Sequence, residues 1–202
     1  MADPRVAVVG AGAWGTTLSR LVAWMEPVTL LCHSPATAAR IAETGRNETR
    51  LPGIDLPPTV IATADPAALR DATDLVVFAA PSAHLRSTVM AAAPFLAPEA
   101  DLLSVVKGLE RDTLLRMSQV VAEAAGVPIG RVAALSGPNL AAEVARNLPA
   151  SAVVAAADLA LAQRIVELER LQGSRGRVRH FAGEEIDLDL AVGIDHAHET
   201  LP

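Results

Sequence analysis

The stretch V-A-V-V-G-A-G-A-W-G, which runs from Val6 to Gly15, decides the fold of this chain. Its first four residues are apolar without a break, as in a strand that is buried on both faces, and a helical pattern begins at Trp14. Between these two patterns, Gly10, Gly12 and Gly15 have the G-x-G-x-x-G spacing of a phosphate-binding turn.

Each of the three glycines has its own expected task. Gly10 makes the tight turn, Gly12 lets the backbone approach a pyrophosphate, and Gly15 allows the helix to pack closely on the strand. The free N–H groups and the dipole at the helix N-terminus then stabilise the anion. The alternative interpretation is a glycine-rich turn that holds no ligand.

Short apolar runs alternate with longer helical patterns along the rest of the chain. The expected strands are Arg5–Val9, Val28–Leu31, Val60–Ala62, Leu75–Ala79, Leu102–Val106, Val132–Leu135, Ala152–Ala155 and, as a last one, Arg177–Phe181. The expected helices are Trp14–Met25, Ala36–Thr44, Ala67–Asp71, Ala83–Phe95, Thr113–Ala125, Leu140–Arg146 and Leu159–Leu171. This alternation predicts one doubly wound α/β domain of the Rossmann type, with a mostly parallel sheet and helices on both faces.

Cap and turn residues precede several of the expected helices. Asp65-Pro66 and Pro81-Ser82 stand where a cap and a first turn belong, and Asp112 or Thr113 is expected to cap the helix that follows. The connection at positions 45–58, G-R-N-E-T-R-L-P-G-I-D-L-P-P, has no clear periodicity. A loop of this length is either functional or flexible.

The end of the second expected strand bears on the choice of cofactor. An NAD-binding fold usually has an acidic residue there for the ribose 2′-hydroxyl, whereas this chain has Cys32, His33 and Ser34. An acid would repel a 2′-phosphate, and His33 and Ser34 can donate hydrogen bonds to one. The sequence therefore permits NADP and mildly favours it over NAD; the alternative for His33 is an exposed loop histidine.

Two further polar segments follow the ends of expected strands, where doubly wound folds bind ligands. The first is S-V-V-K-G-L-E, Ser104 to Glu110, whose Lys107 is the only lysine among 17 basic residues. The alternatives for Lys107 are an ordinary solvated surface lysine and a residue that is kept for its compact point charge, and its rarity in this chain raises the odds of the second. The second is L-S-G-P-N-L-A-A-E, Leu135 to Glu143, in which Asn139 either caps a helix or offers its amide to a substrate.

Composition excludes several classes of function. The chain of 202 residues has a formal net charge of -6 and few aromatic residues, which argues against a nucleic-acid partner. No apolar run is long enough to cross a bilayer, and the first residues do not resemble a signal peptide. A single cysteine, Cys32, excludes an intramolecular disulfide and favours the cytoplasm. The His and Asp residues of the tail fit no metal-binding motif, so no metal site is predicted.

The ordered set of motifs resembles the N-terminal part of bacterial NAD(P)-dependent glycerol-3-phosphate dehydrogenases. The matching segments, over roughly residues 5–170, are G-A-G-A-W-G-T-T-L, N-E-T-R-L-P-G-I-D-L-P, D-L-V-V-F-A-A-P-S, S-V-V-K-G-L-E and L-S-G-P-N-L-A-A-E-V-A. The resemblance implies hydride transfer between NAD(P)H and dihydroxyacetone phosphate or sn-glycerol 3-phosphate, a step in glycerophospholipid precursor synthesis.

The resemblance also implies roles for individual residues. Trp14 and His33 would lie along the dinucleotide, and Lys107 would contact both the cofactor and the phosphorylated substrate. Gly137 and Asn139 would border the substrate, and Ala13 and Ala141 would lie near the cofactor. The chain departs from the family pattern at Ala13, where Ser or Asn is usual, at His33, where Arg is usual, and at Arg50, where Tyr is usual.

Nothing after residue 170 matches the family's helical second domain, whose first segment carries the proton-transferring lysine. We therefore expect a dinucleotide-binding domain over residues 1–172 and a divergent tail over 173–202, and we expect this chain to be weakly active or inactive. A working dehydrogenase and a non-catalytic NAD(P)-binding sensor or regulatory module, with a homodimer interface made by the tail, are the alternatives.

Overall fold

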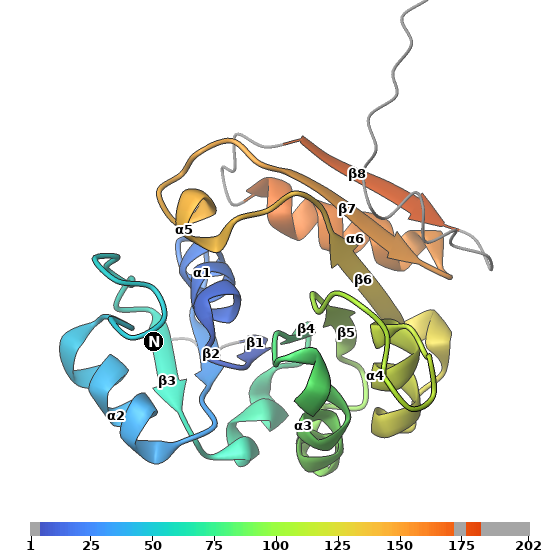
Figure 1. Cartoon of the computed structure of the whole chain (residues 1–202), viewed down its shortest axis with the longest axis horizontal. Helices are drawn as coiled ribbons and strands as arrows, with labels where there is room; N and C mark the ends of the chain where they lie inside the picture. The colour runs from blue at the N-terminus through green and yellow to red at the C-terminus, as the bar shows by residue number, and fades with distance from the viewer. Residues whose placement is uncertain (1–4, 172–176, 183–202) are drawn as a thin grey trace, which may run out of the picture.

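The computed structural model describes residues 5–171 and 177–182, which form one eight-stranded sheet flanked by helices (Figure 1). The strands are β1 (Val6–Val9), β2 (Val28–Leu31), β3 (Val60–Thr63), β4 (Leu75–Phe78), β5 (Asp101–Ser104), β6 (Val132–Ser136), β7 (Ser151–Ala156) and β8 (Arg177–Ala182). The α-helices are α1 (Ala13–Val22), α2 (Pro35–Thr44), α3 (Leu85–Ala92), α4 (Met117–Ala125), α5 (Ala141–Val144) and α6 (Leu159–Leu171). The 3-10 helices are η1 (Pro66–Asp71), η2 (Ser82–His84), η3 (Ala93–Phe95) and η4 (Ile129–Arg131).

The strand order is β3-β2-β1-β4-β5-β6-β7-β8. The first six strands are parallel and follow the 3-2-1-4-5-6 order of dinucleotide-binding folds, whereas β7 runs antiparallel to β6 and β8 runs parallel to β7. The predicted doubly wound, mostly parallel sheet is confirmed, and so is the predicted last strand. Since β1 pairs with both β2 and β4, the direction of strand order reverses at β1, and a crevice is expected at its carboxyl end.

Alternate residues of β1 pack into two separate cores, one on each face of the sheet. Val6 and Val8 belong to the core under α1, α2 and α6, and Ala7 and Val9 to the core under α3 and α4. All four are buried, as the uninterrupted apolar run predicts for a central parallel strand. Helices on both faces leave the carboxyl edge of the sheet for binding.

Side-chain caps mark the starts of two helices, and one predicted helix start needs correction. Ser34 caps α2 and Asp65 caps η1, each by accepting a hydrogen bond from a backbone N–H. The predicted helix over Thr113–Ala125 is wrong in its first turn, because α4 begins at Met117 and neither Asp112 nor Thr113 caps it. Thr113 instead donates its hydroxyl to Glu110, 2.5 Å away, within the preceding loop.

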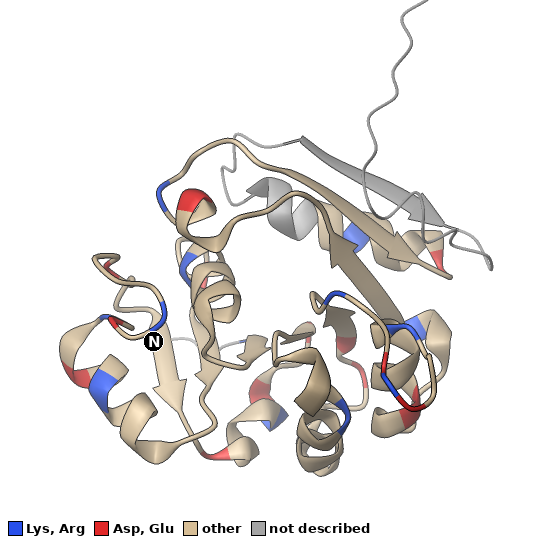
Figure 2. Cartoon of the chain, in the orientation of Figure 1, with Lys and Arg blue, Asp and Glu red and all other residues tan. Residues whose placement is uncertain are grey.

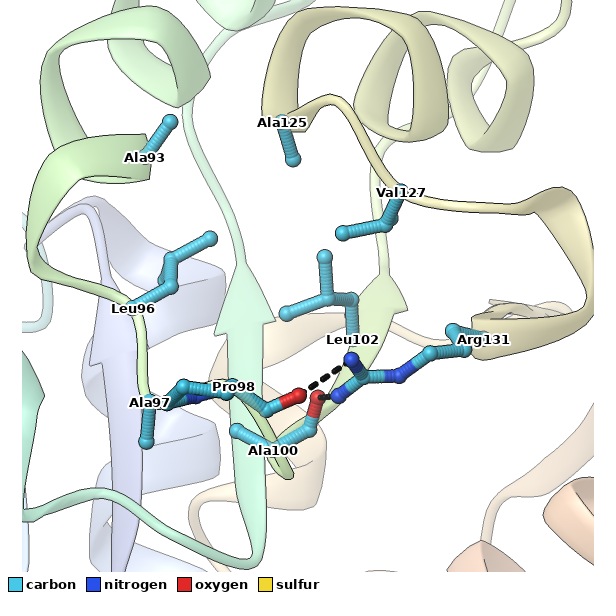
Figure 3. A pocket seen from close by; sticks show the side chains of 9 residues that line it. All are labelled: Ala93, Leu96, Ala97, Pro98, Ala100, Leu102, Ala125, Val127 and Arg131. Carbon is cyan, nitrogen blue, oxygen red and sulfur yellow. Dashed lines mark hydrogen bonds between the residues drawn. The ribbon is translucent and has the colours of Figure 1, made fainter.

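A small apolar hollow lies at the opposite edge of the sheet, near the amino ends of β5 and β6 (Figure 3). Leu96, Leu102 and Val127 line it, and the guanidinium of Arg131 donates to the backbone carbonyls of Pro98 and Ala100. Arg131 therefore joins the segment before β5 to the segment before β6. Its position makes it a suitable control for substitutions at the carboxyl edge.

Candidate nucleotide-binding site

The glycine-rich turn packs as its sequence predicts at two of its three glycines. Gly10 has a φ of +115°, and a Cβ there would lie 3.0 Å from backbone atoms of Ala79 and Ala80. A Cβ on Gly15 would lie 1.9 Å from the carbonyl oxygen of Gly10. The tight turn at Gly10 and the close packing at Gly15 are thus confirmed, because no larger residue fits either position without movement of the backbone.

Gly12 is different, because the space around it is open. A Cβ on Gly12 would meet no atom within 4 Å, and Gly12 offers no side chain to cap α1. The first N–H groups of a helix have no acceptor within the helix, and the first intrahelical bond here runs from the Thr16 N–H to the Gly12 carbonyl. Open space beside uncapped backbone donors fits a pyrophosphate group, which the helix dipole would also favour.

The connection at positions 45–58 reaches this turn, so it contributes to the site. The Asn47 side chain is buried and its amide Nδ2 lies 3.0 Å from the carbonyl oxygen of Ala11 and 2.8 Å from Oγ1 of Thr16. The sequence left open whether this loop is functional or flexible. Its contacts with Ala11 and Thr16 support a functional loop beside the glycine-rich turn. The sequence marked the segment by its length but did not indicate which residue makes the contact.

The three residues after β2 that bear on the choice of cofactor have different environments. Cys32 is buried, and burial raises the pKa of its thiol to about 11, so the thiol stays neutral and unreactive. Ser34 is occupied as the cap of α2, where its hydroxyl oxygen accepts from the Thr37 N–H at 3.2 Å. His33 is exposed at the carboxyl edge. Of the two proposed donors to a 2′-phosphate, His33 has its side chain free of the cap.

The structure brings Lys107 and Gly137 together from two different strands. Lys107 follows β5, and its Nζ donates to the carbonyl oxygen of Gly137, 2.6 Å away, at the end of β6. Gly137 has a φ of +147°, and a Cβ there would lie 2.4 Å from the carbonyl oxygen of Ser151. Asn139 is half-buried and follows this turn, but the N-cap of α5 is Leu140, so the capping alternative for Asn139 is wrong.

A hydrogen bond also connects α5 to the glycine-rich turn. The Thr17 hydroxyl contacts the carbonyl oxygens of Ala13, at 2.9 Å, and Ala141, at 3.1 Å. Figure 1 shows the short helix α5 next to α1. Ala13 and Ala141, two of the residues assigned to the cofactor, therefore lie on either side of one buried threonine. Thr17 carries no signal of this contact in the sequence, where it is an ordinary residue of the expected helix.

A group of charged residues fixes the loop that carries Lys107. Arg86 on α3 donates twice to Glu110, with both N···O distances at 2.8 Å, and once to Glu123 on α4, at 2.9 Å. Figure 2 shows this meeting of basic and acidic segments between α3, α4 and the loop after β5. The hydrogen bonds from Arg86, and after them the one from Thr113, lower the pKa of Glu110 to about 2.

The described residues contain neither a membrane-spanning helix nor a cluster of metal ligands. Within residues 5–171 and 177–182, no helix is long and apolar enough to span a membrane. No group of three or more His, Cys, Asp and Glu residues in the same ranges is arranged to hold a metal ion. The tail histidines His196 and His198 lie outside the described residues.

Comparison with known proteins identifies the family to which this chain is similar. The family described as NAD-dependent glycerol-3-phosphate dehydrogenase N-terminus matches residues 5–162. The chain belongs to this family. That match covers the glycine-rich turn, the connection at positions 45–58, Lys107 and the segment after β6, so every residue named for the site lies within it.

Individual relatives agree with this assignment. A glycerol-3-phosphate dehydrogenase [NAD(P)+] of Corynebacterium kroppenstedtii is 47% identical over 164 residues, which are 80% of this chain and 49% of that protein. One of Mycobacterium leprae is 42% identical over 189 residues, 91% of this chain and 53% of that protein. The crystal structure of the enzyme from Coxiella burnetii has a TM-score of 0.77 at 30% identity, over 89% of this chain and 55% of that one. The chain spans about half the length of the curated relatives it matches.

The contrast between Gly15 and Gly12 gives a first prediction. Gly15→Ala should lower the free energy of unfolding by about 3 kcal/mol, because its methyl group collides with the Gly10 carbonyl. Gly12→Ala should stay within about 1 kcal/mol of the parent, because its methyl group enters open space. Urea unfolding followed by circular dichroism measures both changes. Equal losses in the two variants would contradict the packing described here.

The ion pair of Arg86 and Glu110 gives a second prediction, on pH. Since folding lowers the Glu110 pKa from its unfolded value of roughly 4.3 to about 2, the ionised pair stabilises the fold above about pH 5. That contribution should be lost as the pH falls from about 5 to about 2. Glu110→Gln should therefore flatten the acid limb of stability in urea unfolding measured at pH 5 and pH 2.5. Glu99→Gln, an exposed position at the opposite edge, is the control and should keep the parent's slope.

Proposed function

We propose that residues 1–172 of this chain form the dinucleotide-binding domain of an NAD(P)-dependent glycerol-3-phosphate dehydrogenase. The observation that carries the proposal is the open space at Gly12 beside the uncapped start of α1, in a chain of this family. The reaction interconverts dihydroxyacetone phosphate and sn-glycerol 3-phosphate, and the nicotinamide supplies or accepts the hydride when it is bound.

The chain's own residues divide into two groups around this edge. For the dinucleotide, Gly10, Gly12, Ala13, Trp14 and Gly15 form the turn that receives the pyrophosphate, with N–H groups of the first turn of α1 as donors. His33, at the end of β2, is exposed where the ribose and its 2′-substituent would lie, and Ala141 joins the turn through Thr17. The cofactor is NADP or NAD. His33 stands where NAD-binding folds usually have an acidic residue, so no carboxylate there repels a 2′-phosphate.

The substrate group is built on Lys107, Gly137 and Asn139. Lys107 is exposed and stands 2.6 Å from the Gly137 carbonyl, so its ammonium can attract a phosphorylated small molecule to the ends of β5 and β6. The half-buried Asn139 adds an amide beside it. Lys107 thus serves as the positive charge that orients substrate and cofactor.

We expect weak or no turnover from this chain by itself. The proton-transferring lysine that the resemblance implies has no counterpart here, because Lys107 is the only lysine in the sequence. General acid–base assistance of that kind contributes roughly 10²–10⁴-fold in rate. The single cysteine supports a cytoplasmic location, and the acidic net charge supports a small-molecule rather than a nucleic-acid partner. A homodimer stays a prediction.

The second candidate is a non-catalytic NAD(P)-binding module that senses nucleotide. The open space at Gly12 beside the uncapped start of α1 supports it, because a sensor needs only the nucleotide-binding turn. The two candidates differ in the substrate. A dehydrogenase domain needs the Lys107 and Asn139 edge to bind dihydroxyacetone phosphate, whereas a nucleotide sensor has no use for that ligand.

The test is a titration of the purified chain with NADPH and with NADH, followed by addition of dihydroxyacetone phosphate. We expect saturable nucleotide binding, binding of dihydroxyacetone phosphate to the nucleotide complex, and little loss of absorbance at 340 nm. Lys107→Met should weaken substrate or cofactor binding much more than Arg131→Met, the control at the opposite edge. Equal effects would return Lys107 to a surface role, nucleotide binding without substrate binding would favour the sensor, and no nucleotide binding would refute both candidates.

The third prediction concerns the choice between the two cofactors. His33→Asp should lower the ratio of NADPH to NADH affinity, because a carboxylate at the end of β2 repels the 2′-phosphate and accepts from the ribose hydroxyl. Gln163→Glu also adds a carboxylate, at an exposed position on α6, and should leave the ratio unchanged. Isothermal titration with each nucleotide gives the ratio. A ratio that His33→Asp does not move would remove His33 from this role.

A further inference from the structure

One buried amide, Asn47, holds the glycine-rich turn from outside it. Its side chain is 2% exposed, and its Nδ2 donates to the Ala11 carbonyl at 3.0 Å and to the Thr16 hydroxyl at 2.8 Å. Ala11 lies between the first two glycines of the motif, and Thr16 lies in the first turn of α1. A single side chain from positions 45–58 therefore connects the turn to the helix that it opens.

The contact to Ala11 fixes the direction of a neighbouring donor. In a trans peptide, the carbonyl of one residue and the N–H of the next point in opposite directions, and no peptide bond in the described chain is cis. Since the Ala11 carbonyl points at Asn47, the Gly12 N–H must point away from Asn47. The hydrogen bond from the Asn47 side chain opposes rotation of the Ala11–Gly12 peptide, which glycine at position 12 would otherwise permit.

The segment that presents Asn47 is itself well anchored. The Asn47 carbonyl accepts from the N–H groups of Arg50, at 3.0 Å, and Leu51, at 2.7 Å, and the Leu51 side chain is buried. Asp55 closes the segment, because its carboxylate lies 2.5 Å from Arg46 and its carbonyl oxygen accepts from Arg20 of α1 at 3.2 Å. The loop therefore behaves as a rigid support for the amide.

We propose that Asn47 is a positioning residue for nucleotide binding: it holds the Ala11–Gly12 peptide and the first turn of α1 in the orientation that a pyrophosphate requires. This rests on the proposed nucleotide-binding function. Asn47 acts through Ala11 and Thr16 and does not itself contact the ligand. An amide suits the position because it donates to both acceptors without adding a negative charge near an anion.

The experiment compares Asn47→Asp and Asn47→Ser in the whole chain, with Gln163→Glu as the control. Gln163 is exposed on α6, so the same change from amide to carboxylate there should have no effect on binding. All variants carry Trp24→Phe, which leaves Trp14, inside the glycine-rich turn, as the only tryptophan. Circular dichroism gives the folded fraction, titration with NADH gives the Kd of the folded protein, and Trp14 emission without nucleotide reports on the turn.

We expect Asn47→Asp to raise the Kd for NADH about 10-fold or more, because it loses the donor to Ala11 and puts a carboxylate behind the turn. Asn47→Ser, whose shorter side chain cannot reach both acceptors, should raise it about 5-fold, and it decides the question if Asn47→Asp does not fold. Both variants should also shift Trp14 emission before nucleotide is added, whereas Gln163→Glu should match the parent.

Two results would overturn the proposal. One is a Kd for NADH, corrected for the folded fraction, that stays within 2-fold of the parent's in the variants that fold. Asn47 would then support only the fold, even if these variants were less stable than the parent. The other is unchanged Trp14 emission in those variants. If the parent binds neither NADPH nor NADH, the proposed function fails on its own, and a shifted Trp14 emission still shows whether Asn47 holds the turn.

Discussion

The structure depends on one close approach, that of Gly15 to the carbonyl oxygen of Gly10. The start of α1 can lie over the end of β1 only because position 15 has no Cβ, which would otherwise be 1.9 Å from that oxygen. This contact sets where α1 begins, and α1 in turn carries one side of the larger core through Leu18 and Val22. Gly12, the N-cap of the same helix, is by contrast open, with no atom within 4 Å of the position of a Cβ.

Several distant segments of the chain then attach to α1. Asn47 reaches its first turn from the connection after α2, and Thr17 joins it to Ala141, 124 residues further along the chain. Lys107 is joined in a similar way to Gly137, across the ends of β5 and β6. These bonds involve few charged groups, and they gather the expected nucleotide and substrate residues along a single edge. The carboxyl edge of the sheet is therefore built mainly by uncharged side chains and backbone carbonyls.

Charged groups have a separate task, which is to hold the outer loop. Arg86 meets Glu110 with two parallel hydrogen bonds and Glu123 with a third, so α3, α4 and the loop after β5 share one guanidinium. Lys107 lies three residues before Glu110, in the loop that this guanidinium holds. Its own ammonium bonds the Gly137 carbonyl, and the residue is exposed at the carboxyl edge.

The sequence by itself determined the strand–turn–helix unit, the parallel sheet, the family and the residues of the turn. It could do so because glycine spacing and apolar periodicity are local properties of consecutive residues. Only the tertiary structure decided that Met117 begins α4, that Asn139 is not a cap, and that Asn47, Thr17 and Arg86 support the site. The contacts of Asn47, Thr17 and Arg86 join residues that are far apart in the chain, and neither residue type nor spacing encodes which partners the fold brings together. The start of α4 depends instead on a local choice, because the Thr113 hydroxyl bonds Glu110 in the preceding loop and does not cap the helix.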